Sequence, residues 1–211
     1  MDIRKLVVEF IGTFFLVLTV GLTVIDPGAG AFAPIAIGTV LAVMIFAGGH
    51  ISGGHYNPAV TLGVWLRGKL TLSEASGYWV VQVLGGIVAA LAVVFLKPAL
   101  PAEALIASVD VGAALLAEFL FTFALVYVVL NVATAKGTEG NSFYGWAIGF
   151  TVLVGAYAVG SVSGASFNPA VTVGGSIMNI FSWSNIWIYL VAEFLGGVVA
   201  AYVFRYLHPG E

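Results

Sequence analysis

The tripeptide Asn-Pro-Ala occurs twice in the chain, as Asn57-Pro58-Ala59 and as Asn168-Pro169-Ala170, and Val-Thr follows each copy. Asn is a preferred helix N-cap, and Pro suits the first helical position because its missing N–H would have no partner within the helix. Each copy therefore predicts the start of a helix. If the side-chain oxygen of each Asn caps its own helix, the side-chain N–H groups are free to donate hydrogen bonds to a passing molecule with an oxygen atom, such as water.

The helices that these motifs begin are too short to cross a membrane. The apolar stretch Pro58–Leu66 would rise about 13.5 Å, which is about half of a hydrocarbon core of roughly 30 Å. The stretch after Asn168 has the same character. Two such half-helices that enter from opposite faces would meet at their positive N-terminal ends, which opposes cations and turns the protons of a bound water away from the centre.

The rest of the chain has the composition of a membrane protein. Of its 211 residues 61% are hydrophobic and only 8% are charged, against about 25% charged residues in soluble domains. A membrane-spanning helix needs about 20 apolar residues. Six runs meet this need, at about Leu6–Ile25, Phe32–Gly49, Ser73–Leu96, Val111–Val132, Phe143–Gly160 and Trp183–Leu207. The predicted fold class is an all-α membrane protein with six transmembrane helices and two re-entrant half-helices.

The composition also excludes several functions. Seven basic residues in a net charge of -3 provide no positive surface for nucleic acid. The chain has no Cys, which excludes disulfides, thiolate metal sites and a Cys nucleophile. No nucleophile is paired with a base in the sequence, so we expect neither an enzyme nor a cofactor.

The chain is an internal repeat. Aligning Asn57 with Asn168 also aligns Ser52-Gly53 with Ser163-Gly164 and Gly85-Gly86 with Gly196-Gly197. The two halves, about 1–97 and 108–211, each contain three predicted spans. Because three is odd, the second half must enter the membrane from the opposite side, which gives inverted repeats within one transmembrane domain of residues 1–211.

The positions of the basic residues predict how the chain is oriented in the membrane. With both termini in the cytoplasm, only Lys97 lies outside, and the other basic side chains lie inside, as the positive-inside rule requires; these are Arg4, Lys5, Arg67, Lys69, Lys136 and Arg205. We expect no targeting extension at the short termini. We therefore expect a multi-pass protein of a bacterial or archaeal plasma membrane.

These features together resemble the aquaporin (major intrinsic protein) family over nearly the full length. The resemblance depends on the two Asn-Pro-Ala motifs, the approach Ser52-Gly53-Gly54-His55-Tyr56, the paired Glu9 and Glu118, and the six-span inverted repeat. It implies a passive channel for water and small neutral solutes that excludes ions and protons. It also implies a homotetramer with one pore in each subunit.

The resemblance also places a selectivity filter. Family members usually carry an Arg directly after the second Asn-Pro-Ala, where this chain has Val171. The family's spacing gives the other filter positions as Ile37, Ala156 and Ala165. This filter has no charge and no side-chain donor, so it implies a wide, apolar pore open to ammonia, urea, hydrogen peroxide, glycerol or metalloid acids. A strictly water-selective channel remains the alternative. Glycerol facilitators usually carry Arg-Asp after the second motif, where this chain has Val171-Thr172, so a dedicated glycerol channel is not favoured.

Three acids lie inside apolar runs, where an ionisable group is costly. Glu9 and Glu118 occupy equivalent places, and we expect them to accept hydrogen bonds from the non-helical backbone before each half-helix. Glu193 falls opposite Gln82 in the repeat, which indicates hydrogen bonding. A proton relay is the alternative.

His50 and His55 are expected to pack in the loop or to line the pore, with a pH gate as the alternative. A metal site is not expected because a third ligand is missing. Two other classes stay open for the whole chain. A secondary transporter is also built from inverted repeats, but the midplane of this chain offers two Asn and no carboxylate. An ion channel would need a ring of charges or carbonyls.

Overall fold

The computed structural model describes residues 2–211. It contains eight α-helices in the order α1 Ile3–Val24, α2 Ala33–Ser52, α3 Pro58–Leu66, α4 Leu72–Leu96, α5 Val111–Thr134, α6 Tyr144–Ser163, α7 Pro169–Ile177 and α8 Ile186–Leu207. Three short 3-10 helices, η1 Gly30–Phe32, η2 Lys136–Thr138 and η3 Trp183–Asn185, lie in the connections. The only β-pairing among the described residues is an isolated bridge between Ile106 and Phe181.

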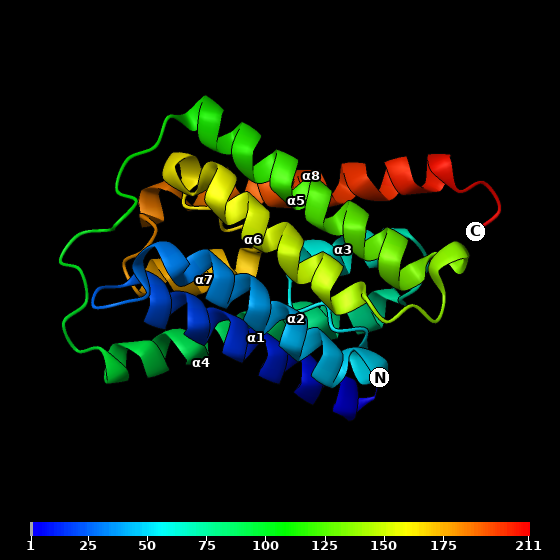
Figure 1. Cartoon of the computed structure of the whole chain (residues 1–211), viewed down its shortest axis with the longest axis horizontal. Helices are drawn as coiled ribbons and strands as arrows, with labels where there is room; N and C mark the ends of the chain where they lie inside the picture. The colour runs from blue at the N-terminus through cyan, green and yellow to red at the C-terminus, as the bar shows by residue number, and fades with distance from the viewer. Residues whose placement is uncertain (1) are drawn as a thin grey trace.

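Six of the helices are long and apolar enough to cross a membrane. They run side by side as one bundle, with the short helices α3 and α7 inside it (Figure 1). The predicted fold class, six spans with two half-helices, is confirmed. Large apolar side chains such as Leu84, Phe95 and Leu195 are exposed on the outside of the bundle, as expected of a surface that faces lipid.

Two helices continue further than the sequence prediction placed them. The predicted spans ended at Gly49 and Gly160, but α2 and α6 continue to Ser52 and Ser163. Each then ends at a left-handed glycine, Gly53 with φ 94° and Gly164 with φ 91°. A glycine in this conformation is the common helix C-terminus, whereas Gly49 and Gly160 keep helical geometry.

The half-helices are held by the other half of the chain. Helix α3 packs against α8 as well as α4, and α7 packs against α4 as well as α8. Helix α8 approaches α3 closely, and α4 approaches α7 closely, because a glycine faces the start of each half-helix. A Cβ atom built on Gly197 would lie 2.8 Å from the carbonyl oxygen of Ala59, and one on Gly86 would lie 2.7 Å from that of Ala170.

The two ends of the bundle carry different polar groups. Both termini lie at the same end (Figure 1). Lys97 lies after the C-terminus of α4, where its ammonium group donates to the backbone carbonyls of Leu22, Ile25 and Pro27. Near the termini, Lys5 pairs with Glu74 at 3.1 Å. Glu74 also completes a capping box with Thr71 at the start of α4, which fixes that helix end.

Candidate functional site

Each Asn of the paired motifs caps the half-helix that follows it. The Asn57 Oδ1 atom accepts from the backbone N–H of Ala59 at 2.8 Å and from that of Val60 at 3.4 Å. The Asn168 Oδ1 atom accepts from the N–H of Ala170 at 2.9 Å. Both Asn residues have extended backbones and are followed by Pro in the first helical position, which is the geometry that the sequence predicts.

The two motifs are also tied to each other across the repeat. The Asn57 Nδ2 atom donates to the carbonyl oxygen of Phe167 at 2.8 Å, and the Asn168 Nδ2 atom donates to that of Tyr56 at 2.9 Å. An amide has two side-chain N–H groups. The expectation that both are free is therefore wrong, because one N–H of each Asn holds the opposite loop and one is left for a passing molecule.

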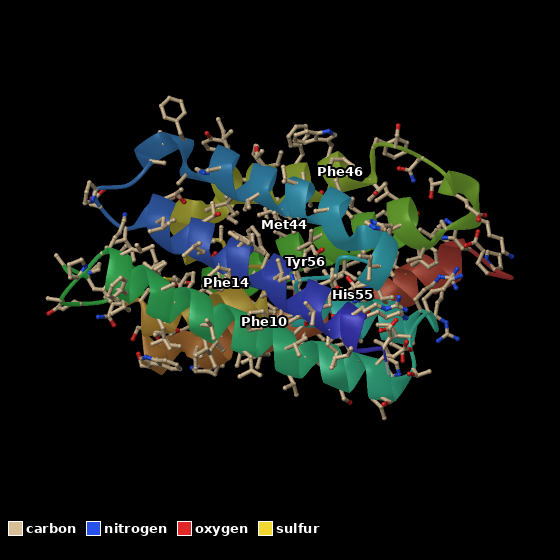
Figure 2. The ribbon with its side chains drawn as sticks, turned by 90° about the horizontal axis from the view of Figure 1, so that it is seen from below. Phe10, Phe14, Met44, Phe46, His55 and Tyr56 are labelled. Carbon is tan, nitrogen blue, oxygen red and sulfur yellow. The ribbon has the colours of Figure 1, made fainter. Side chains whose placement is uncertain are left out.

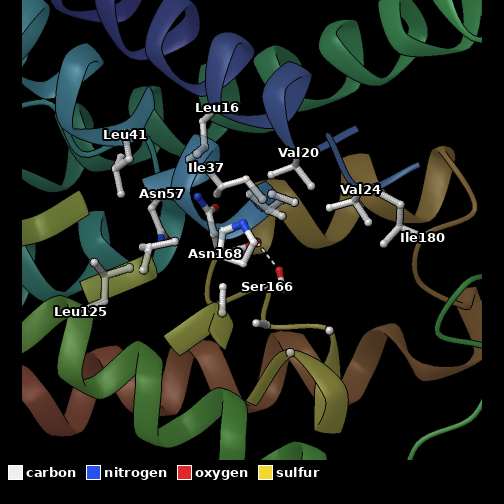
Figure 3. A pocket seen from close by; sticks show the side chains of 18 of the residues that line it. Leu16, Val20, Val24, Ile37, Leu41, Asn57, Leu125, Ser166, Asn168 and Ile180 are labelled. Atoms are coloured by element: carbon white, nitrogen blue, oxygen red, sulfur yellow. Dashed lines mark hydrogen bonds between the residues drawn. The ribbon is translucent and has the colours of Figure 1, made fainter. Parts of the chain in front are cut away.

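A cavity of about 180 Å³ contains both amides. Its lining is mostly apolar, and Figure 3 shows Asn57 and Asn168 together among the side chains of Leu16, Val20 and Ile180. The four positions that the family spacing gives for the filter line this same cavity; they are Ile37 on α2, Ala156 on α6, Ala165 before the second motif and Val171 on α7.

A second cavity of about 680 Å³ lies at the end of the bundle where the termini are. Lys5, His50 and Lys136 line it. His55 lines both cavities and so lies at their junction. Its ring is buried, and its Nδ1 atom is 3.1 Å from Thr61 Oγ1. The structure therefore separates the two histidines, because His50 lines only the larger cavity whereas His55 lines both cavities; Figure 2 shows His55 beside Tyr56.

Non-helical segments lead into both motifs and expose backbone carbonyls. No residue within 2–211 donates a hydrogen bond to the carbonyl oxygens of residues 53–55 or of residues 164–166. Residues 164–166 line the smaller cavity, and Gly53 and His55 line the larger one. Unpaired carbonyls are tolerated at membrane depth where they line a water-filled cavity. These segments therefore supply acceptors on both sides of the paired amides.

Glu9 and Glu118 anchor these segments as the sequence predicts. The Glu9 carboxylate accepts from Ser52 Oγ at 2.7 Å and from the backbone N–H of His55 and Tyr56 at 3.0 and 2.7 Å. The Glu118 carboxylate accepts from the equivalent groups, Ser163 Oγ at 2.6 Å and the N–H groups of Ser166 and Phe167 at 3.0 and 2.7 Å.

The anchored backbone is strained. Tyr56, Ala165 and Phe167 have φ values of 49°, 56° and 53°, a left-handed conformation that costs a non-Gly residue about 1–2 kcal/mol. Tyr56 and Phe167 each donate their N–H to an anchoring carboxylate. Figure 2 shows Tyr56 between α1 and α2, and its hydroxyl donates to the carbonyl oxygen of Met44 at 2.9 Å.

Two further side chains hold the ends of α2 and α6, and the sequence analysis did not predict them. Tyr78 Oη donates to the carbonyl oxygen of Ser52 at 2.7 Å, and Tyr189 Oη donates to that of Ser163 at 2.5 Å. These tyrosines occupy equivalent places in the two halves, so the repeat itself carried a signal for them. No comparable sequence signal identifies the leucines and valines that line the smaller cavity. The described residues contain no group of three side chains that could hold a metal ion.

Comparison with known proteins decides the family. A family model described as Major intrinsic protein matches residues 1–204. The chain belongs to the major intrinsic protein family. It is therefore an integral, multi-pass membrane protein of the aquaporin type, a family of channels rather than enzymes, and the resemblance stated from its motifs is confirmed.

Individual members of the family resemble the chain over most of its length. A probable aquaporin of TIP type from Medicago truncatula is 40% identical over 181 residues, which cover 83% of this chain and 70% of that protein. A glycerol uptake facilitator protein-like 6 from Lactiplantibacillus plantarum is 36% identical over 211 residues and covers 96% and 97% of the two chains. The crystal structure of the aquaglyceroporin from Plasmodium falciparum has the same fold, with a TM-score of 0.82, 22% identity, and coverage of 98% of this chain and 97% of that one.

Proposed function

We propose that this aquaporin-type channel passes small uncharged solutes as well as water through an apolar constriction formed by Ile37, Ala156, Ala165 and Val171. One observation carries the proposal. The four residues line the same cavity as Asn57 and Asn168, and none of them has a charge or a side-chain hydrogen-bond donor. A constriction of this kind selects by size and neutrality, because it offers no group that binds water better than another small polar molecule.

The paired amides give the path its orientation. The free N–H of each Asn and the N-termini of α3 and α7 present partial positive charge at one point. A water there accepts hydrogen bonds through its oxygen, and its protons face the carbonyls of residues 53–55 and 164–166. Water molecules on the two sides of the amides are then oriented in opposite directions, so a proton cannot be passed along the file and a cation meets a repulsive field.

The relatives support a mixed set of permeants. They include a protein named for water conduction and another named for glycerol uptake. We propose urea, ammonia, hydrogen peroxide, glycerol and metalloid acids as the candidate solutes, since each is small and has an uncharged form. The rival function is conduction of water alone, which would require the cavity to narrow further than its small side chains suggest.

The assembly and its setting are also proposals. The exposed apolar side chains on the outer face of the bundle suit contact with lipid or with further copies of the chain, and we propose a homotetramer with a pore in each subunit. We propose that both termini lie in the cytoplasm, because most of the basic residues belong to that side of the predicted topology. We propose the plasma membrane of a bacterium or archaeon as the setting.

Stopped-flow light scattering on proteoliposomes tests the proposal. Vesicles are challenged with a hyperosmotic urea gradient, and protein-free liposomes are the control. We expect faster shrinkage as water leaves and faster re-swelling as urea enters. Faster shrinkage with re-swelling at the liposome rate would overturn the proposed solute pathway and favour the water-only rival.

A further inference from the structure

The imidazole ring of His55 turns one nitrogen toward the protein and the other toward the path. Its Nδ1 atom lies 3.1 Å from Thr61 Oγ1, and the ring packs edge-on against Tyr78 with 5.2 Å between centroids. Its Nε2 atom has no hydrogen-bond partner within residues 2–211 and is not one of the fully buried atoms that lack a partner. Nε2 lies beside Gly53, which lines the larger cavity. A permeating molecule can therefore reach Nε2.

The hydrogen bond at Nδ1 decides what Nε2 offers to that molecule. A neutral imidazole carries its proton on one nitrogen, which donates, while the other nitrogen accepts. The tautomer is inferred from the groups around the ring. If the Thr61 hydroxyl donates to Nδ1, the proton of His55 is on Nε2. If Nδ1 donates to Thr61 instead, Nε2 of the neutral ring has no proton.

Gln82 on α4 sets the direction of this bond. Its Nε2 atom donates to Glu9 Oε2 and to Thr61 Oγ1, both at 2.9 Å. The Glu9 carboxylate also accepts from Ser52 Oγ and from two backbone N–H groups, so it serves as an acceptor and fixes which end of the amide faces it. The oxygen of Thr61 thus accepts from the amide, and its own proton is available for another bond.

Two acceptors lie within reach of the Thr61 proton. They are His55 Nδ1 at 3.1 Å and Gln82 Oε1 at 3.3 Å. A proton aimed at Oε1 would lie beside the N–H proton that the same amide already aims at Thr61, and the two would repel each other. The bond to Nδ1 is shorter and has no such conflict. Thr61 therefore donates to His55, and the proton of the neutral ring is on Nε2.

The second half of the chain carries the same bonds in the opposite direction. Glu193 stands where the first half has Gln82, and Thr172 Oγ1 donates to its Oε1 atom at 2.8 Å. Thr172 therefore accepts at its 2.6 Å contact with Ser166 Oγ. Ser166, the counterpart of His55, has one proton, and both of its acceptors, Thr172 Oγ1 and a backbone carbonyl oxygen at 3.1 Å, belong to the protein. The second half thus offers no equivalent donor to the path.

We infer that the hydrogen-bond chain from Gln82 through Thr61 fixes His55 as the tautomer protonated on Nε2, and that this N–H donates to the permeating molecule where the two cavities join. Gln82 is then a positioning residue, because it acts through the ring of His55. The backbone carbonyls of residues 53–55 supply acceptors at the same place. The inference requires only that water passes through the cavities, and it does not depend on the proposed apolar constriction.

Nitrogen NMR of the channel in lipid membranes reads the tautomer directly. Protonated and unprotonated ring nitrogens have well-separated 15N shifts, and one-bond correlations to the ring carbons distinguish Nδ1 from Nε2. The chain has three histidines, so a protein with His50→Gln and His208→Gln leaves the signals of His55 alone. In this background we expect an unprotonated Nδ1 and a protonated Nε2 at neutral pH.

Three variants in the same background test the chain that sets the tautomer. Gln82→Glu replaces the donor with a carboxylate, as in the second half, so Thr61 should donate to it and the protonated nitrogen of His55 should become Nδ1. Thr61→Val removes the hydroxyl and should give a mixture of both tautomers. Thr61→Ser keeps a hydroxyl at this place and is the matched control, which should retain the proton on Nε2.

Osmotic water permeability of proteoliposomes tests whether the donor serves the permeating molecule. With the reversed tautomer the junction offers acceptors only, so the oxygen of a passing water loses its partner there. We expect Gln82→Glu to lower water permeability per folded channel by about two- to tenfold, the effect of one hydrogen bond. Thr61→Ser should retain the permeability of the background protein.

Each readout can overturn the inference. A background protein with a protonated Nδ1, alone or together with Nε2, would contradict the assigned tautomer. Folded Gln82→Glu with the proton still on Nε2 would remove Gln82 from its positioning role. Reversal of the tautomer with unchanged water permeability would show that the donor does not serve the permeating molecule. Should Gln82→Glu not fold, the background spectrum and the difference between Thr61→Ser and Thr61→Val still decide.

Discussion

At the scale of single residues, the paired asparagines have more than one task. Each side chain caps its own half-helix through its oxygen and holds the opposite loop through one N–H. Only the second N–H is left for a permeating molecule. The amide is well suited to this position because Asp offers no N–H and Ser is too short to reach across the repeat.

Variants of Asn57 separate capping from the tie between loops. Asn57→Ser keeps a good N-cap but loses the bond to Phe167, whereas Asn57→Ala loses both. We expect Asn57→Ser to lower the free energy of unfolding by about 1–3 kcal/mol, since it leaves the buried carbonyl of Phe167 unsatisfied. Asn57→Ala should lower it by about 1 kcal/mol more, because the helix cap is lost as well. Chemical unfolding in detergent micelles measures the free energy of unfolding of both variants and so shows which loses more. Equal losses for the two variants would mean that the cap contributes nothing.

At the scale of elements, the half-helices are positioned by contacts between the two halves of the chain. Gly197 on α8 lies against the start of α3, and Gly86 on α4 lies against the start of α7. The two halves therefore cannot separate without exposing the ends of both half-helices. The amides of the pore lie at these same ends, so helix packing and pore geometry depend on one another.

Gly197→Ala tests this contact. Its new Cβ atom would lie 2.8 Å from the carbonyl oxygen of Ala59, so α8 and α3 must move apart. Overpacking of this kind costs about 1–3 kcal/mol, and we expect a lower unfolding temperature together with lower water permeability. Gly112→Ala is the matched control, because its Cβ atom would meet nothing closer than 3.5 Å and the helix gains an alanine. A Gly197→Ala variant as stable as this control would refute the packing argument.

Much of this element-level structure could be predicted from the sequence, and the reasons are physical. Asn followed by Pro specifies a helix start locally, and the repeat makes the two starts equivalent. The ends of α2 and α6 were misplaced by three residues because Gly49 and Gly53 look alike in sequence, and the difference is a backbone angle that tertiary contacts set. The cross-bonds of Asn57 and Asn168 depend on how the halves dock, which local rules do not describe. The lining by Leu16 and Val20 depends on the rotation of α1, for which an apolar helix gives no pattern.

At the scale of the whole molecule, the arrangement of charge predicts the orientation in the membrane. The loop between α4 and α5 and the loop between α5 and α6 lie at opposite ends of the bundle (Figure 1). The termini share an end with the second of these loops. From the basic residues at that end we propose that it lies in the cytoplasm.

Labelling of single cysteines checks the orientation, since the chain has no Cys of its own. Glu103 and Glu139 are exposed residues of the two loops. We expect a membrane-impermeant maleimide to label Glu103→Cys in intact cells, and to label Glu139→Cys only after the cells are permeabilised. The opposite pattern would reverse the assigned topology.

The central claim is that the apolar constriction at Val171 lets neutral solutes pass, and the ratio of urea to water permeability in Val171→Arg tests it most directly. Arg adds bulk and a charged donor to a lining that has neither. We expect urea permeability to fall by tenfold or more, equivalent to a barrier about 1.4 kcal/mol higher, while water permeability falls less. Val171→Leu, the neutral control, should change the ratio far less. If urea and water permeability fall equally in correctly folded Val171→Arg, Val171 is not at the constriction and the account is wrong.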